Sequence, residues 1–349
     1  MSRAPRLDTA GMWEAASALP EQLADALETA RRVFGPVTAT TASTAAPRAV
    51  VALGLGTAAT ACDAVAALAG PQLAVPFVVC RSADVPAIVG PGCLVLAVSA
   101  APDSPETVAA TMEAVDRGAR VVGFGGDGEL ARLAAGSGFA WCPVRPDVPV
   151  ARAALGGAIV SLLCALSGDG LLPDCAPSVN TAVGLLTRRR DAFVADRGIA
   201  AALARRIGRT IPLVYGESGV GAVAARWWKS CVNLNAKSPA FAAELPALAY
   251  DELAGWGQGG DITRQTMTLV LLRHGGEQAP VAGLFGAVRT ATEEVMADVL
   301  EVCAEGDDDL GRFLDLALLG ELVSLELAAG EGVDPGPVPA VEQAHAHQP

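Results

Sequence analysis

The sequence predicts an α/β chain made of two lobes in tandem, each a doubly wound parallel sheet between layers of helices. Three observations support this fold class. Short apolar runs alternate with helical segments from residue 48 to residue 124, and the same alternation restarts at residue 210. Such alternation is typical of parallel sheets. A length of 349 residues is also sufficient for about two domains with separate cores.

The first lobe is preceded by a predicted amphipathic helix at 8–33, where apolar side chains recur at spacings of three and four. Residues 36–48 are rich in Thr, Ala and Pro and predict a loop. In this lobe the sequence pattern predicts, in order, a strand at 48–55, a helix at 58–68, strands at 75–79 and 94–99, a helix at 104–117 and a strand at 120–124.

The second lobe follows a helical stretch that we expect to connect the two. Residues 151–166 predict a buried helix, residues 167–179 interrupt it, and another helix with a run of three arginines follows. The second lobe then predicts a strand at 210–215, a helix at 220–236, a strand at 266–272, and helices at 290–305 and 310–329. The residues after 330 are rich in Pro and Gly and predict a tail.

Composition and charge exclude several classes of partner. Apolar residues make up 52% of the chain and aromatic residues only 4%, so the core must consist mainly of Ala, Leu and Val. The net charge of −13 argues against nucleic acid and anionic membranes as partners, because the long-range field repels both. The N-terminus lacks the apolar region of a signal peptide, and the apolar run at 153–166 is shorter than the roughly 20 residues that span a bilayer. We therefore expect a cytoplasmic protein.

The eight cysteines predict buried, reduced thiols and no metal site. They are scattered without a C-x-x-C pair, and two of the three histidines lie in the polar tail. We expect no cofactor and no metal.

The most specific pattern lies at 226–256. Residues 226–229 read RWWK, 233–241 read NLNAKSPAF, 245–252 read LPALAYDE and 255–256 read GW. In this order and spacing they resemble the signature of the bifunctional phosphoglucose/phosphomannose isomerases. RAALG at 152–156, GELVSLELA at 320–328 and GVDP at 332–335 resemble the same family. The chain is most similar in character to its divergent actinobacterial, TobH-like branch.

The resemblance implies a fold, an assembly and a substrate class. It implies two tandem SIS (sugar isomerase) domains, each a parallel five-stranded sheet sandwiched by helices. The domain bounds would be an N-terminal helix at 1–35, a first SIS domain at 36–150, a helical connector at 151–200, a second SIS domain at 201–330 and a flexible tail at 331–349. The family builds its sites from two subunits, so we expect a homodimer that binds a hexose phosphate, with a heterodimer containing an intact relative as the alternative.

The acid–base positions of this family are substituted in this chain. Aldose–ketose isomerisation moves a proton between two neighbouring carbons, and a carboxylate suits that step. The resemblance puts the family's base at Leu234 and its ring-opening histidine at Tyr250. A tyrosine, with a reference pKa of about 10, is a poor base at neutral pH. Glu252, beside Asp251, and Tyr250 are the remaining catalytic candidates, although Glu252 can equally be read as a solvated or helix-capping carboxylate.

The phosphate loop of an SIS domain is only partly retained. The resemblance aligns its Ser-x-Ser-Gly-Asn-Thr loop with Ser99 to Ser104, which keeps two hydroxyls but carries Ala101, Pro102 and Asp103. The plainer interpretation is a capped helix, with Ser104 as N-cap followed by proline.

Three further candidates for substrate binding, Gly56, Thr57 and Arg152, complete this set. Gly56 and Thr57 belong to an earlier glycine loop. Its pattern is weak evidence for a dinucleotide site, because Ala59 stands where a third glycine would be. Arg152 can equally be read as a partner in an ion pair. The loop at 216–221 (GESGVG) reads as a tight turn whose amides could hold an anion.

Three functional hypotheses remain open from the sequence. The first is a degenerate isomerase that binds a phosphosugar and has a regulatory role. The second is an active aldose–ketose isomerase that uses Glu252 or Asp251 as a substituted base. The third is an interaction protein without a ligand. A fold alone does not choose among them.

Overall fold

A computed structural model describes residues 6–35, 46–99, 103–144, 148, 150–195 and 198–346. These residues form two compact units, which we call the first and the second unit. The first unit comprises Ala18–Gly184, and the second comprises the residues up to Ser17 together with those from Leu185 onward. This division differs from the predicted domain bounds, because the segments at 1–35 and 151–200 are each shared between the units.

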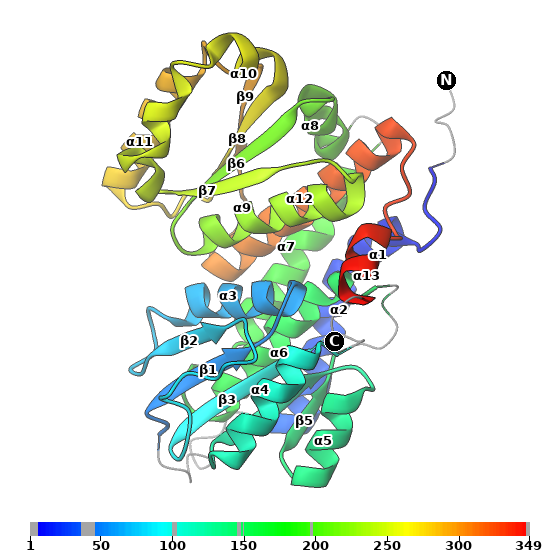
Figure 1. Cartoon of the computed structure of the whole chain (residues 1–349), viewed down its shortest axis with the longest axis vertical. Coiled ribbons are helices and arrows are strands. Elements are labelled where there is room, and N and C mark those ends of the chain that lie inside the picture. The colour runs from blue at the N-terminus through cyan, green and yellow to red at the C-terminus, as the bar shows by residue number, and fades with distance from the viewer. Residues whose placement is uncertain are drawn as a thin grey trace. The chain divides into compact units, whose positions relative to one another are not determined.

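The first unit is built on a five-stranded parallel sheet with the strand order β2-β1-β3-β4-β5 (Figure 1). Its elements are α2 (Leu19–Phe34), β1 (Ala49–Leu53), α3 (Thr57–Ala69), β2 (Phe77–Cys80), β3 (Cys93–Ser99), α4 (Pro105–Asp116), β4 (Arg120–Gly125), α5 (Glu129–Ser137), β5 (Ala140–Pro143), η1 (Ala151–Ala154) and α6 (Leu155–Gly168). The doubly wound parallel sheet predicted for this lobe is confirmed.

Helices cover both faces of this sheet. One face packs against α4 and α5, and the other against α2, α3 and α6 (Figure 1). All residues of β1 and β3 are consequently buried, which explains why both are apolar up to the terminal Ser99 of β3. The stretch Ala151–Gly168 is long and apolar enough to cross a membrane, but 89% of it is buried inside the protein, as befits a core helix.

The second unit contains a four-stranded parallel sheet in the order β7-β6-β8-β9. Its described elements are α1 (Met12–Ser17), α8 (Ile199–Ile207), β6 (Ile211–Glu217), α9 (Val220–Cys231), η2 (Val232–Ala236), β7 (Phe241–Leu245), η3 (Ala247–Tyr250), η4 (Glu252–Trp256), α10 (Gly260–Thr266), β8 (Met267–Arg273), α11 (Ala279–Thr292), β9 (Asp298–Cys303), α12 (Asp309–Glu331) and α13 (Pro339–Ala346). A further helix, α7 (Ala176–Val194), begins in the first unit and ends in the second. Among the described residues this sheet has one strand fewer than the resemblance implies.

Several predicted elements of the second unit need correction. The helix predicted at 290–305 is wrong, because α11 ends at Thr292 and β9 follows. In β9, Leu300 and Val302 are buried while the residues between and after them are exposed, the alternation of an edge strand. The tail predicted after residue 330 contains α13, and the helix predicted at 220–236 ends as α9 at Cys231, where the π-helical turn η2 begins.

Candidate functional site

A cluster of predicted binding residues lies at the carboxyl edge of the first sheet. The strand order reverses between β1 and β3, and ligands of open α/β sheets bind in the crevice at such a switch point. Gly56 and Thr57 follow β1, Ser99 is the last residue of β3, and Ser104 precedes α4. The structure therefore brings these four candidates to one edge, where the N-termini of α3 and α4 are also found.

The loop after β1 has the conformation that glycine permits. Gly56 is the N-cap of α3 with φ 55° and ψ −126°, in the region that side chains rarely adopt. A Cβ atom added there would meet no atom within 4 Å, so the loop faces open space. A Cβ on Gly54 would lie 3.2 Å from the carbonyl oxygen of Val98, so the loop runs close against β3. Thr57 begins α3, whose free amides can receive an anion.

The two serines differ in their surroundings. Ser99 is buried, and its carbonyl oxygen lies 2.1 Å from where a Cβ on Gly125 would be, so β3 and β4 meet tightly here. The Ser104 hydroxyl accepts a hydrogen bond from the backbone N–H of Thr107 at 3.3 Å and donates one to the Thr107 hydroxyl at 2.6 Å. The capped-helix interpretation of Ser104 is therefore confirmed.

Asp103 has a structural partner on the neighbouring helix. Its Oδ2 accepts a hydrogen bond from the backbone N–H of Leu130 at 2.8 Å, in the first turn of α5. The N-cap of α5 is Gly128, which has no side chain to satisfy that amide. Asp103 thus supplies a carboxylate that stabilises the start of α5. Ala101 and Pro102 lie outside the described residues.

Asp103→Ala is expected to lower the free energy of unfolding by about 1 kcal/mol, because the capping acceptor of α5 is lost. Urea denaturation monitored by circular dichroism would measure this loss. Glu106→Ala, in the first turn of α4, serves as the comparison. An unchanged stability in Asp103→Ala would show that the carboxylate does not cap α5.

Arg152, the fifth predicted binding residue, is half-buried in η1. This short 3-10 helix contacts α3, the helix that Thr57 begins. All five predicted substrate-binding residues therefore belong to the first unit.

The two predicted catalytic residues belong to the second unit and have very different surroundings. Glu252 accepts a hydrogen bond from the buried Tyr215 hydroxyl, which in turn accepts one from Trp256 Nε1 at 3.2 Å. Burial, and then the hydrogen bond to Glu252, raise the pKa of Tyr215 well above its usual range, so this hydroxyl keeps its proton. Tyr250 is 89% exposed. Glu252 is therefore already engaged as an acceptor, and Tyr250 is a surface side chain.

The asparagines of the signature stretch hold the backbone around Leu234. Asn233 Nδ2 donates to the Ser238 carbonyl at 2.8 Å, and the buried Asn235 donates to the Ser324 hydroxyl at 2.9 Å. Leu234 lies between them on the π-helical turn η2 and is half-buried. π-Helical turns are common at functional sites. The backbone is thus held on both sides of Leu234, the position that the resemblance aligns with the isomerases' base, and leucine cannot carry a proton.

At the edge of the second sheet where its strands end, the protein places the side chain of Glu217. The strand order of this sheet reverses between β6 and β8, and Glu217 ends β6. Glu217 Oε2 lies 3.1 Å from His274 Nε2, and both residues are buried. Because His274 Nδ1 accepts the backbone N–H of Gly276 at 3.3 Å, Nε2 carries the hydrogen and donates it to Glu217. A buried carboxylate at this position disfavours an anion at the 216–221 loop.

Sequence reasoning did not find this Glu217–His274 pair. The two residues are 57 positions apart, and only the parallel pairing of β6 with β8 brings them together. The one signal in the sequence was an acidic residue inside a glycine-rich turn.

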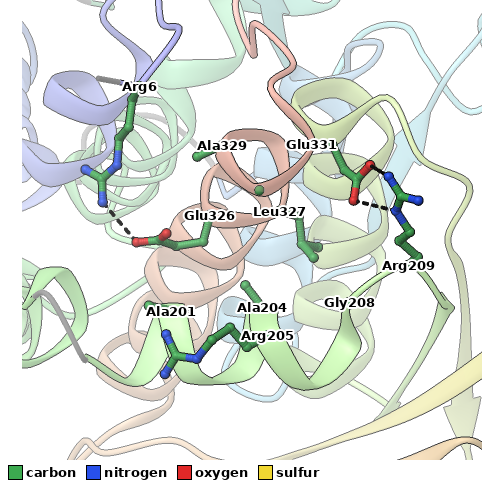
Figure 2. Close-up of a pocket in the computed structure, with 11 residues that line it drawn as sticks. Arg6, Ala201, Ala204, Arg205, Gly208, Arg209, Glu326, Leu327, Ala329 and Glu331 are labelled. Atoms are coloured by element: carbon green, nitrogen blue, oxygen red, sulfur yellow. Dashed lines mark hydrogen bonds and ion pairs between the residues drawn. The ribbon is translucent and has the colours of Figure 1, made fainter. Parts of the chain in front are cut away.

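A pocket of about 380 Å³ lies elsewhere in the second unit, between the C-terminal ends of α8 and α12 (Figure 2). Arg6 pairs with Glu326 at 3.0 Å, and Arg209 forms a two-pronged ion pair with Glu331 at 2.9 and 3.0 Å. Arg205 also lines the pocket. The predicted site residues do not line it, and two of its three arginines are neutralised by carboxylates of α12.

Comparison with known proteins agrees with this geometry. Residues 197–347 match the family described as the bacterial phospho-glucose isomerase C-terminal SIS domain. The chain is 27% identical over 335 residues to a bifunctional phosphoglucose/phosphomannose isomerase of Caldicellulosiruptor bescii, covering 95% of this chain and 97% of that protein. The chain is therefore similar to bifunctional phosphoglucose/phosphomannose isomerases over nearly its whole length, and its C-terminal part matches an SIS domain family. The predicted resemblance to these isomerases is thereby confirmed.

Solved structures support the same SIS fold. The tagatose-6-phosphate ketose/aldose isomerase of Escherichia coli superposes with a TM-score of 0.71 at 13% identity, with 96% of each chain covered. A glucose-6-phosphate isomerase like protein of Thermus thermophilus superposes with a TM-score of 0.54 at 21% identity, covering 92% of this chain and 96% of that one. At these identities the likeness concerns the fold of the SIS chain alone.

Proposed function

We propose that this SIS protein binds a hexose phosphate and has lost the proton-transfer chemistry of its isomerase relatives, so that it acts as a binding or regulatory protein in sugar-phosphate metabolism. The observation that carries the proposal is a contrast between its two units. The first keeps a glycine loop and hydroxyls at the sheet's switch point, whereas the second has Leu234 at the family's base position.

The binding half of the proposal rests on the first unit. A phosphate at the switch point would meet the N-termini of α3 and α4, where backbone amides and the helix dipoles favour negative charge. Thr57 and Ser99 add hydroxyl groups at the same edge. With a net charge of −13, the protein gains little from long-range attraction, so these local donors must supply the affinity.

The loss of catalysis rests on the second unit. Loss of one general acid or base costs a factor of about 10² to 10⁴. Leucine stands at the position of the family's base, and a tyrosine that is 89% exposed stands at the position of its histidine. Glu252, the candidate for a substituted base, is already the acceptor of the Tyr215 hydroxyl. These features favour binding over turnover.

Ligand-induced thermal stabilisation tests the binding half. A ligand that binds only the native state must raise the melting temperature. We expect a dose-dependent rise with one of the common hexose 6-phosphates. In Thr57→Val and Ser99→Ala the dissociation constant is expected to rise about tenfold or more, because each variant removes one hydrogen bond to a charged group. Arg205→Ala, in the pocket of the second unit, is the matched control and is expected to leave the affinity unchanged.

The outcomes separate the three hypotheses. Flat melting curves across hexose and pentose phosphates would contradict the proposal and favour an interaction protein without a ligand. If Arg205→Ala loses affinity for the hexose phosphate while Thr57→Val keeps it, the binding site is the arginine-lined pocket instead. Isomerase turnover that disappears in Glu252→Gln would favour the active isomerase. The family resemblance leads us to propose a cytoplasmic homodimer. A heterodimer with an intact relative would instead show two different chains in the mass spectrum of the size-exclusion peak.

A further inference from the structure

Two cysteines of the first unit lie next to each other, although the sequence offered no C-x-x-C pair. Cys164 Sγ and Cys175 Sγ are 3.4 Å apart, and the residues are eleven positions apart in the chain. Cys164 lies on α6 and is 6% exposed, whereas Cys175 directly precedes α7 and is half-buried. Cys164 is thus enclosed by the core, and Cys175 is the more exposed residue of the pair.

The loop that joins the two cysteines is held in place from both sides. Asp169 forms a two-pronged ion pair with Arg120, both contacts at 2.7 Å. Asp174 pairs with Arg31 at 2.8 Å and accepts the backbone N–H of Ala176 at 3.0 Å. The ion pairs anchor the segment that leads to Cys175, and the Asp174 bond to the Ala176 amide fixes the turn around it, so the sulfur atoms are kept near each other before any bond forms.

We propose that Cys164 and Cys175 form a redox-active dithiol, which hydrogen peroxide converts into an intramolecular disulfide. The sulfur atoms need to approach from 3.4 Å to about 2 Å, a shift that side-chain rotation within the fixed loop can supply. This modification site is separate from the proposed sugar-phosphate chemistry and does not depend on it.

The surroundings assign the order of the steps. Cys175 is the more exposed of the two residues, so it is the one that meets peroxide first. Either sulfur can donate the hydrogen bond between them; with Cys164 as the donor, that bond lowers the pKa of Cys175, while the same bond and burial raise the pKa of Cys164. The Cys175 thiolate attacks one peroxide oxygen, the O–O bond breaks, and hydroxide leaves as water after taking a proton. The Cys164 sulfur then attacks the sulfenic acid on Cys175, the S–S bond forms, and a second water leaves. Two thiols are oxidised by two electrons in total, and one peroxide is reduced to two waters.

Mass spectrometry of the full chain after peroxide treatment tests this proposal. Cys303→Ser is the background, because Cys303 is an exposed thiol that would react on its own. Trypsin leaves both cysteines on the peptide 153–188, and cleavage before Asp169 and Asp174 separates them unless a disulfide joins them. We expect a joined pair that resists alkylation and is released by dithiothreitol. Closing the loop between these cysteines, which are eleven positions apart, should raise the melting temperature by roughly 5 °C.

Two variants complete the design. Cys142→Ser removes a buried thiol of the same unit, whose pKa burial raises to about 11, and is expected to leave the disulfide intact. Cys175→Ser is expected to abolish it. The proposal is overturned if Cys164 and Cys175 can both still be alkylated after peroxide treatment of the protein that retains them. It is also overturned if the mapped disulfide joins two other cysteines. The deciding measurement is the disulfide map of the protein that keeps both cysteines. The proposal can therefore be tested even if Cys175→Ser does not fold.

Discussion

Arg189→Met is expected to destabilise the protein by about 3–5 kcal/mol, because it leaves a buried carboxylate without its charge partner. Asp315 on α12 is 1% exposed. Arg189 Nε donates to its Oδ1 at 2.8 Å and Nη2 to its Oδ2 at 3.1 Å, and the backbone N–H of Glu305 donates to Oδ2 at 2.9 Å. Urea denaturation measures the change in the free energy of unfolding. Arg206→Ala, which breaks an exposed ion pair with Asp298, is the matched control and should cost less than about 1 kcal/mol.

The cost of Arg189→Met should depend on pH. Burial already raises the pKa of Asp315, although Arg189 opposes that shift, so its removal raises the pKa further. A carboxyl group whose folded pKa exceeds its unfolded pKa is most stabilising below the unfolded value, and this contribution is lost as pH rises through the folded pKa. The variant is therefore expected to be closest to the parent protein in acid and furthest from it near neutrality. A cost that stays constant with pH would contradict the role of an uncompensated Asp315 charge.

Gly320→Ala is expected to destabilise the second unit by about 1–3 kcal/mol through overpacking. A Cβ on Gly320 would lie 2.3 Å from Trp228 Cδ1. The Trp228 indole is 1% exposed and donates from Nε1 to the Leu316 carbonyl at 2.8 Å, so it cannot move aside without breaking this bond. The close approach of α9 and α12 therefore requires glycine at this position.

The same helix offers a matched control for this prediction. Gly330 lies on α12 with no atom within 4 Å of an added Cβ. Gly330→Ala is expected to stabilise by about 0.5–1 kcal/mol, because alanine is the better helix former. Equal effects of the two substitutions in thermal denaturation would show that Trp228 does not restrict Gly320.

Buried, regular elements of this fold could be predicted from the sequence. The predicted strand at 94–99 and helix at 310–329 correspond to β3 and α12, which are buried along nearly their whole length; β3 is therefore almost entirely apolar, and α12 is rich in Leu and Ala. The predicted helix at 290–305 failed because β9 is a short edge strand with only two buried residues, and the Glu residues in and around it mimic a helix. The strand β7 was not predicted at all, since its Ala-rich sequence lacks β-branched residues.

The candidate site could be predicted only in part. The glycine loop and the Ser104 cap could be predicted from short sequence patterns, because turn and cap geometry depends on residues adjacent in the chain. The partner of Glu252 could not be foreseen, since Tyr215 lies 37 positions away on a central strand. The approach of Cys164 to Cys175 likewise depends on ion pairs with distant arginines rather than on a short motif.

The most direct test of the central claim follows the substrate's own protons. An isomerase that transfers a proton between two carbons exchanges the C2 proton of a hexose 6-phosphate with solvent, even when no net product accumulates. We would incubate the wild-type protein with glucose 6-phosphate and mannose 6-phosphate in deuterated water and record proton NMR spectra. We expect broadened ligand signals, which report binding, together with an undiminished C2 proton signal. Loss of the C2 signal to deuterium at a rate proportional to protein concentration would contradict it.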